Sequence, residues 1–128
     1  MKSLSQNLII VSTSLNTLTD NENTERHREL TLYLNLMNIP HEELTGQFGG
    51  INEYCVMFDA QYSRVAEIVL KDYDQESYLE HHNDRTCELV FNNGHRKKLG
   101  VMREVNEVEA MKKAAWTKTK DNRYFVAE

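Results

Sequence analysis

The chain is poor in residues that constrain a fold covalently or interrupt regular structure: its 128 residues include two cysteines, one proline and five glycines. Cys55 and Cys87 each lie in an apolar stretch, where a small buried thiol is more common than a disulfide or a metal ligand. Free thiols are typical of a reducing cytoplasm. No apolar run is long enough to cross a bilayer, and the residues before Leu8 lack the apolar segment of a signal peptide. The sequence therefore predicts a cytoplasmic protein that makes no membrane contact.

An excess of positive charge is also absent. The chain has 20 acidic and 15 basic residues, for a formal net charge of -5, which opposes nonspecific attraction to a phosphate backbone. Nucleic acid is therefore not the favoured partner. Hydrophobic residues make up 40% and charged residues 27%, which is ordinary globular usage, and the length suits one core. We expect a single domain over residues 1–128.

Signatures of catalysis, phosphate binding and metal binding are missing as well. Ser12 and Ser77 have no identifiable base and no nucleophile-elbow motif, and no glycine-rich phosphate loop occurs. The five histidines show no recurring ligand spacing; they are His27, His41, His81, His82 and His95. The sequence therefore predicts no metal site, no cofactor and no catalytic residue set.

Hydrophobic periodicity predicts the order strand, helix, strand, strand, helix, strand over residues 8–91. The first strand, 8–11, is apolar throughout and should be covered on both faces. The first helix begins near Asp20, because Thr19 and Glu22 have the spacing of a capping box, and it ends before Pro40. The remaining elements are expected at 41–45 (an edge strand), 53–58, 60–72 and 75–82, with a mobile glycine-rich hairpin tip at 46–50.

This order most simply forms an α+β, ferredoxin-like split βαβ sandwich (βαββαβ). Asn92-Asn93-Gly94 predicts a hairpin turn between strands at 86–91 and 95–101. A short helix at 106–115 and short strands at 116–119 and 123–126 should follow. Residues 92–128 are thus expected to extend the sheet of an 8–91 core, and short edge strands make a homodimer reasonable.

Right-handed connections in such a sandwich would bring polar segments to one rim of the sheet, at the N-terminus of the first helix. Backbone amides there favour an anion. Arg26 can either add a bidentate contact to that anion or pair with Glu53. A structural role is the alternative to ligand binding for these residues, since asparagine and glutamine side chains often form hydrogen bonds with the backbone of loops. The predicted ligand-binding residues are Ser12, Asn16, Asn23, Arg26, Glu53 and Gln75.

At these residues the chain resembles a small, uncharacterised domain-of-unknown-function family of proteobacteria and tailed phages. The shared pattern is Ser-Thr at the end of a strand, an Asn, an Asn and an Arg in the first helix, a Gly, a Glu and a Gln. It covers about residues 8–91, whereas the tail from Leu99 looks like the phage members. The matching residues are Ser12, Thr13, Asn16, Asn23, Arg26, Gly46, Glu53 and Gln75.

Three functional hypotheses follow. The first is a non-enzymatic phage accessory protein in the host cytoplasm that binds a small anionic ligand or nucleotide at the rim. The second is a protein-binding inhibitor of a host enzyme or defence system, anchored either by an exposed sheet edge or by the C-terminal region of Trp116 and Tyr124. The third is a small hydrolase that uses Glu53 as a general base. The first two describe a protein that is not an enzyme.

Overall fold

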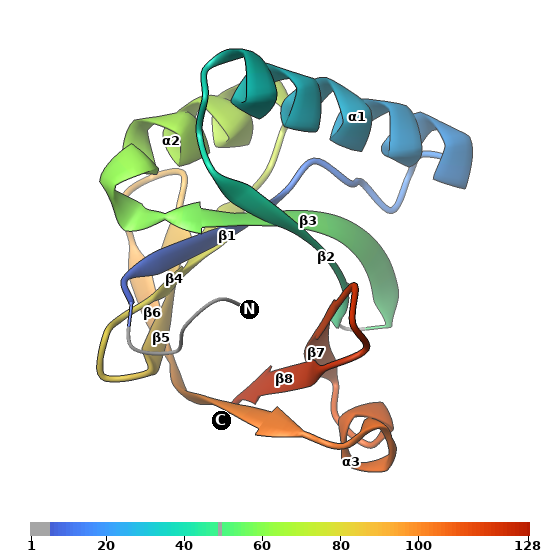
Figure 1. Ribbon diagram of the computed structural model, residues 1–128, viewed down its shortest axis with the longest axis vertical. Helices are drawn as coiled ribbons and strands as arrows, with labels where there is room; N and C mark the ends of the chain where they lie inside the picture. The colour runs from blue at the N-terminus through green and yellow to red at the C-terminus, as the bar shows by residue number, and fades with distance from the viewer. Residues whose placement is uncertain (1–5, 49) are drawn as a thin grey trace.

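The strands of the protein form a closed barrel, which appears as a ring in Figure 1. The computed structural model describes residues 6–48 and 50–128. In this part of the chain the strand order around the barrel is β1-β3-β2-β7-β8-β6-β5-β4, and neighbouring strands are antiparallel. The strands are β1 (Leu8–Ser12), β2 (His41–Phe48), β3 (Ile51–Asp59), β4 (Ser77–His81), β5 (Thr86–Phe91), β6 (Arg96–Val105), β7 (Ala115–Thr119) and β8 (Tyr124–Ala127).

The prediction of a ferredoxin-like sandwich is wrong, because the sheet closes on itself instead of ending in two free edges. Residues 77–81 of β4 pair with β5, and residues 44–48 of β2 pair with β7. β6 and β8 join these two sides. The segment 92–128 therefore completes a barrel rather than extending an open sheet. The predicted homodimer loses the exposed edge strands that motivated it and stays untested.

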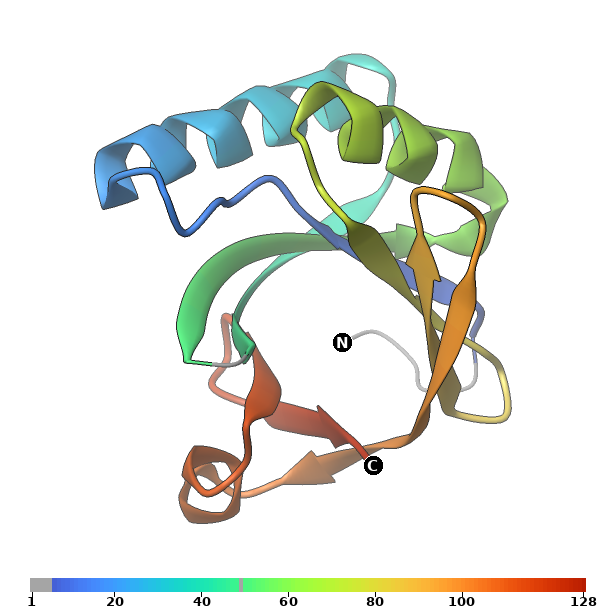
Figure 2. The ribbon, with the colours of Figure 1, turned by 180° about the vertical axis from the view of Figure 1, so that it is seen from behind.

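Two long helices cover one side of the barrel. These are α1 (Asp20–Leu36) and α2 (Ser63–Asp72), which follows the short 3₁₀ turn η1 (Ala60–Tyr62). Both views show α1 and α2 side by side over β1, β3 and β4, with α3 (Glu107–Met111) on the far side beside β7 and β8 (Figures 1 and 2). No described helix is long and apolar enough to span a membrane.

Strand alternation divides the apolar residues of β1 between two of the three cores in the described chain, because successive side chains point to opposite faces of a sheet. In β1, Ile9 and Val11 pack under the helices, in a core that includes Leu34, whereas Leu8 and Ile10 face the barrel interior. The interior core also contains Cys55, Met57, Leu79, Met102 and Phe125. The prediction that the first strand is covered on both faces is confirmed.

Several local predictions are confirmed. The α1 capping box between Thr19 and Glu22 is present, α2 ends at Asp72, and β5 has the predicted bounds. Cys55 and Cys87 are free and buried. The prediction that residues 41–45 form an edge strand is wrong, because β2 lies between β3 and β7.

The glycine-rich tip is shorter than predicted. β2 continues to Phe48 and β3 starts at Ile51, and these two residues pair. Gly49 lies outside the described residues. The predicted loop 46–50 therefore consists largely of β2, and Gly46 is a buried strand residue rather than part of a mobile tip.

Candidate functional site

A cavity of about 530 Å³ lies at the end of the barrel where β1 ends and β3 and β4 begin. This volume is within the range of about 300–1,000 Å³ that is typical of small-molecule sites. The apolar lining comes largely from barrel strands and includes Ile10, Phe48, Leu79, Leu89, Leu99, Met102 and Phe125. The polar lining comes from strand ends and the adjoining loops and includes Ser12, Ser14, Asn16, Glu53, Asp74, Gln75, Glu76 and Ser77. The cavity therefore combines an apolar interior with a polar entrance.

Glu53 is the carboxylate that enters the interior of the barrel. It lies on β3 two residues before Cys55, which faces the interior core, so strand alternation directs Glu53 to the same side. Its carboxylate makes no hydrogen bond or ion pair within residues 6–48 and 50–128. Loss of solvent around the half-buried group raises the pKa of Glu53 to about 7. A carboxylate in these surroundings is balanced most simply by a bound cation.

The charged residues around the cavity have one sign. Among the described lining residues are three acids, Glu53, Asp74 and Glu76, and no lysine, arginine or histidine. The other ionisable group is the Cys55 thiol, whose pKa burial and the Glu53 charge hold far above its usual range. Like charges in a low-dielectric cleft create a potential that attracts the opposite charge. The cavity therefore favours a cationic ligand, not the anion expected from the sequence.

Arg26 is a brace for the backbone and does not line the cavity. Its Nε donates to the Thr13 carbonyl and its Nη2 to the Tyr73 carbonyl, both at 2.7 Å. The guanidinium also lies 5.0 Å from the centroid of the Tyr73 ring. The side chain thus ties the loop after β1 to the end of α2. Arg26 and Glu53 form no ion pair in the described chain.

Replacing Arg26 with alanine is expected to lower the free energy of unfolding by about 2–4 kcal/mol, because two carbonyls lose charge-assisted hydrogen bonds. Urea denaturation monitored by circular dichroism would measure the change. Arg28→Ala is the matched control on the same helix, since Arg28 is exposed and its side chain pairs, among the described residues, with Glu25 alone at 3.5 Å, a contact worth less than about 0.5 kcal/mol. Equal effects of the two substitutions would contradict the bracing role.

Asn23 also holds the loop after β1. Its Oδ1 accepts from the Leu15 amide and its Nδ2 donates to the Leu15 carbonyl, each at 2.9 Å. Ser12 Oγ donates to the Tyr54 carbonyl at 2.9 Å and accepts from the Ser14 amide at 3.0 Å. These bonds fix the loop between β1 and α1 against β3, which sets the shape of the cavity entrance.

Gln75 connects the same loop to the start of β4. Its Nε2 donates to the carbonyls of Ser14 and Tyr73, at 3.0 and 3.1 Å. Its Oε1 and the side-chain amide of Asn16 make no hydrogen bond within the described chain. Both residues line the cavity. They therefore offer free polar groups to a ligand at the entrance.

Of the six residues predicted from the sequence, four line one cavity and two do not. Ser12, Asn16, Glu53 and Gln75 belong to the lining, whereas Asn23 and Arg26 support the loop behind it. Their roles in ligand binding stay predictions. The N-terminus of α1, where an anion was expected, already carries two acids in its first turn, Asp20 and Glu22. The Glu22 carboxylate accepts from the Thr19 amide at 3.0 Å, and the Asp20 carboxylate accepts from the Tyr54 hydroxyl at 2.6 Å.

Sequence reasoning missed the other side of the cavity. Phe48, Ala115, Thr117, Phe125 and Ala127 contribute to the lining, because β7 pairs with β2 and with β8. It also missed Asp74 and Glu76, which flank Gln75 in the connection from α2 to β4. The position of Asp74 and Glu76, directly beside the predicted site residue Gln75, was a usable signal for these two acids. No local pattern indicated the lining residues from β2, β7 and β8.

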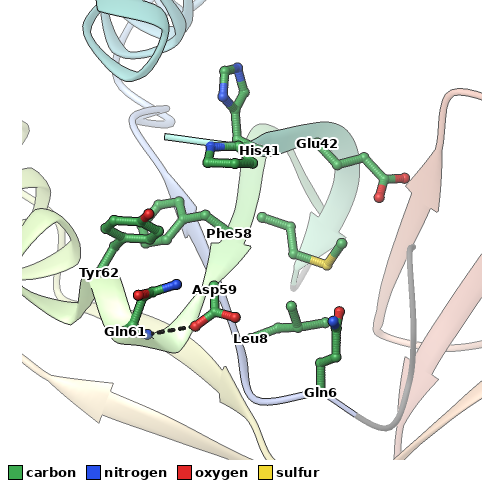
Figure 3. Close-up of a pocket in the computed structure, with 10 residues that line it drawn as sticks. Gln6, Leu8, His41, Glu42, Phe58, Asp59, Gln61 and Tyr62 are labelled. Atoms are coloured by element: carbon green, nitrogen blue, oxygen red, sulfur yellow. Dashed lines mark hydrogen bonds between the residues drawn. The ribbon is translucent and has the colours of Figure 1, made fainter. Parts of the chain in front are cut away.

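A second, smaller pocket of about 170 Å³ lies at the opposite ends of β1 and β3. Figure 3 shows Leu8 and Asp59 side by side beneath Phe58 and Tyr62. The Asp59 carboxylate accepts from the Gln61 amide at 2.8 Å (Figure 3). That bond caps η1, so it serves the local backbone.

One group of potential metal ligands occurs in the described chain, away from the cavity. Ligand atoms of Glu80, His82 and Glu88 lie within 4.8 Å of one another. Arg96 Nη1 lies 3.0 Å from Glu80 and 3.6 Å from Glu88, so a side-chain cation already balances these acids. The group is best described as an ion-pair network.

The cavity and the Glu53 carboxylate, which is unpaired among the described residues, form a candidate small-molecule site whose charge suits a cationic ligand. A family model described as the S-Adenosylmethionine lyase family matches residues 9–128. No curated protein is significantly similar to the chain. Because the match covers nearly all of the sequence, the chain belongs to the S-Adenosylmethionine lyase family.

This membership corrects the function predicted from the sequence. The expected membership of a small family is confirmed, but the family is one of enzymes, so the non-enzymatic accessory protein is wrong. The inhibitor and the hydrolase using Glu53 also receive no support, because the matching family is named for a lyase. Nothing in the match indicates a phage or proteobacterial origin.

Proposed function

We propose that the protein cleaves S-adenosylmethionine in the 530 Å³ cavity, at the bond between the sulfonium sulfur and Cγ of the methionine part. The observation that carries this proposal is Glu53, an unpaired carboxylate in a cavity whose described lining has no basic residue. S-adenosylmethionine supplies two cations to such a site, the sulfonium and the α-ammonium. Its size suits a cavity of this volume.

The proposed step uses the substrate's own carboxylate as the nucleophile. A carboxylate oxygen bonds to Cγ while the Cγ–S bond breaks, and the electron pair of that bond returns to sulfur. The products are homoserine lactone and neutral 5′-methylthioadenosine. No proton is transferred and no water is consumed, so the reaction is a lyase reaction that needs no catalytic base.

The apolar interior suits this step because charge disappears as it proceeds. A carboxylate and a sulfonium combine into an uncharged ester and an uncharged thioether. Water stabilises the separated charges of the substrate more than the transition state, so a drier site favours the reaction. The cavity that Glu53 lines has such surroundings, since its apolar lining includes Ile10, Leu79, Leu89 and Met102.

Elimination of a Cβ proton is the competing route that uses no water, and the lining residues do not favour it. The Cβ–H bond is not activated by an adjacent carbonyl, so its removal requires a strong base. Glu53, with a pKa of about 7, is a weak base for this purpose. The Cys55 thiol stays neutral because burial raises its pKa.

In this proposal Glu53 binds the cationic part of the substrate, and the entrance residues orient the methionine part. Asn16 and Gln75 Oε1 have free hydrogen-bonding capacity there, which suits the ammonium and carboxylate. Ser12 and Ser14 fix the loop that carries Asn16. Holding the substrate's own carboxylate close to Cγ, on the side opposite the sulfur, favours the conformation from which the attack can occur.

Product analysis in ¹⁸O-labelled water tests the reaction. Purified protein incubated with S-adenosylmethionine is expected to yield 5′-methylthioadenosine and homoserine lactone, identified by mass spectrometry. Homoserine formed by later opening of the lactone carries ¹⁸O in its carboxyl group, whereas direct attack of water on Cγ places ¹⁸O in the hydroxyl. Hydroxyl label, vinylglycine, or an intact substrate would each contradict the proposal.

A further inference from the structure

We infer that Phe48 is the surface on which the adenine ring of the substrate stacks. This inference rests on the proposed function, because it assigns a subsite for the adenosyl part of S-adenosylmethionine. Phe48 is a half-buried residue of β2 that packs against the interior core and lines the cavity. It therefore combines support from the core with contact to the space that a ligand would fill.

The position of the Phe48 ring depends on Gly46. A Cβ added at Gly46 would lie 2.6 Å from Cε2 and 3.1 Å from Cζ of Phe48. It would also lie 3.0 Å from the Trp116 carbonyl oxygen on β7. The ring thus occupies the place that any other side chain at position 46 would take. Glycine at position 46 therefore leaves the space that the Phe48 ring occupies.

The other aromatic residues of the lining are less suited to stacking. Phe125 is 1% exposed, in the interior core. Trp116 packs its ring against Tyr124 at 5.5 Å, in the separate core under α3. Among the described lining residues, Phe48 is therefore the aromatic side chain that is both supported by the core and open to the cavity.

The placement of Phe48 relative to Glu53 matches the substrate. Gly46 is the residue paired with Glu53, and Phe48 lies two positions further along β2. Diagonal neighbours of this kind are about 7–8 Å apart at the backbone. The ribose of S-adenosylmethionine separates the adenine from the sulfur by one sugar ring. An adenine on Phe48 therefore leaves the sulfonium beside Glu53.

Stacking on Phe48 acts on a part of the substrate that does not react, so it should contribute equally to substrate and transition state. Phe48→Leu keeps an apolar side chain but removes the ring. It is expected to weaken 5′-methylthioadenosine binding by about tenfold and to raise KM similarly with kcat nearly unchanged. Gly46→Ala displaces the ring and should have the same effect.

Calorimetry with 5′-methylthioadenosine and steady-state kinetics with S-adenosylmethionine test this subsite. Phe48→Tyr keeps the ring and should retain wild-type affinity, whereas Phe91→Leu removes a ring outside the cavity and serves as the matched control. Thermal melts report whether each variant is folded. A loss confined to Phe48→Leu and Gly46→Ala supports stacking.

The outcomes for this subsite and for the reaction are distinguishable. A wild-type protein that cleaves S-adenosylmethionine, with folded Phe48→Leu binding 5′-methylthioadenosine within twofold of wild type, would overturn the subsite and leave the reaction intact. Failure of the wild type to bind 5′-methylthioadenosine would also overturn the subsite. Binding that depends on Phe48, in a protein that leaves S-adenosylmethionine intact, would support the subsite and overturn the reaction.

Discussion

Replacing Glu53 with glutamine is expected to lower kcat/KM for S-adenosylmethionine by about a hundredfold or more. The substitution keeps the shape of the side chain but removes the Glu53 carboxylate, which enters the apolar interior of the barrel. Loss of a charged partner in a desolvated site typically costs about 2–4 kcal/mol. Initial rates of 5′-methylthioadenosine formation measure the effect. A decrease of less than threefold would contradict a role for Glu53 in binding the cationic substrate.

The same substitution is expected to stabilise the protein at alkaline pH. The pKa of Glu53 is about 7 in the folded state and 4.5 as its ordinary value, so the folded protein binds the proton more tightly than the unfolded chain. Ionisation of Glu53 therefore lowers the free energy of unfolding. This loss is absent below about pH 4.5, grows as the pH rises, and is complete above about pH 7. It amounts to about 3 kcal/mol.

Denaturation in urea at pH 8 and at pH 4 measures this gain. Glu53→Gln should exceed wild type by up to about 3 kcal/mol at pH 8 and by little at pH 4. Glu76→Gln is the matched control, since Glu76 also lines the cavity but is exposed, and should change stability by less than about 0.5 kcal/mol. A glutamine variant less stable than wild type at pH 8 would mean that the carboxylate has a stabilising partner.

The second large effect is on the pH dependence of cleavage. Only ionised Glu53 attracts a cation, so kcat/KM is expected to rise about tenfold per pH unit at acidic pH and to level off above about pH 7. At pH 5 the value should be about a hundredfold below the plateau. Because kcat/KM refers to the free enzyme, this profile reports the pKa of Glu53 before the substrate binds. A bound cation would favour the ionised carboxylate and lower that pKa.

A pH series of initial rates at low substrate concentration provides the measurement. The Glu53→Gln variant should show a low and flat profile, because the titrating group is gone. Circular dichroism at each pH separates titration from unfolding. A rise of the same shape in the glutamine variant would assign the pH dependence to another group, and a fall in kcat/KM between pH 5 and 7 would contradict the proposed charge of Glu53.

Local sequence patterns predicted the elements well because their causes are local. The capping box of Thr19 and Glu22 marks the start of α1, and Asn93-Gly94 marks the hairpin between β5 and β6. Gly94 has a φ of 85° there, which glycine adopts without strain. Such signals involve residues a few positions apart, so they can be read from the chain alone.

The candidate site was predictable only in part. Ser12, Asn16, Glu53 and Gln75 meet because β1, β3 and β4 are neighbours. Arg26 was expected to contact a ligand because its charge is visible in the sequence. Its actual acceptors, the carbonyls of Thr13 and Tyr73, are backbone groups, which no sequence pattern reveals. Because Arg26 was counted among the ligand contacts, the sequence predicted an anionic ligand, whereas the charged residues of the described lining are acids.

The amino-acid sequence by itself determined where helices and strands form and which side of each strand is apolar, since these depend on spacing within one segment. It also indicated that Glu53 stands at the start of an apolar strand. Only the tertiary structure decided that the barrel closes, through the pairing of β2 with β7, whose residues are about 70 positions apart in the chain. Pairing over such a separation depends on the packing of the whole chain, and it is this closure that encloses Glu53 in an apolar cavity.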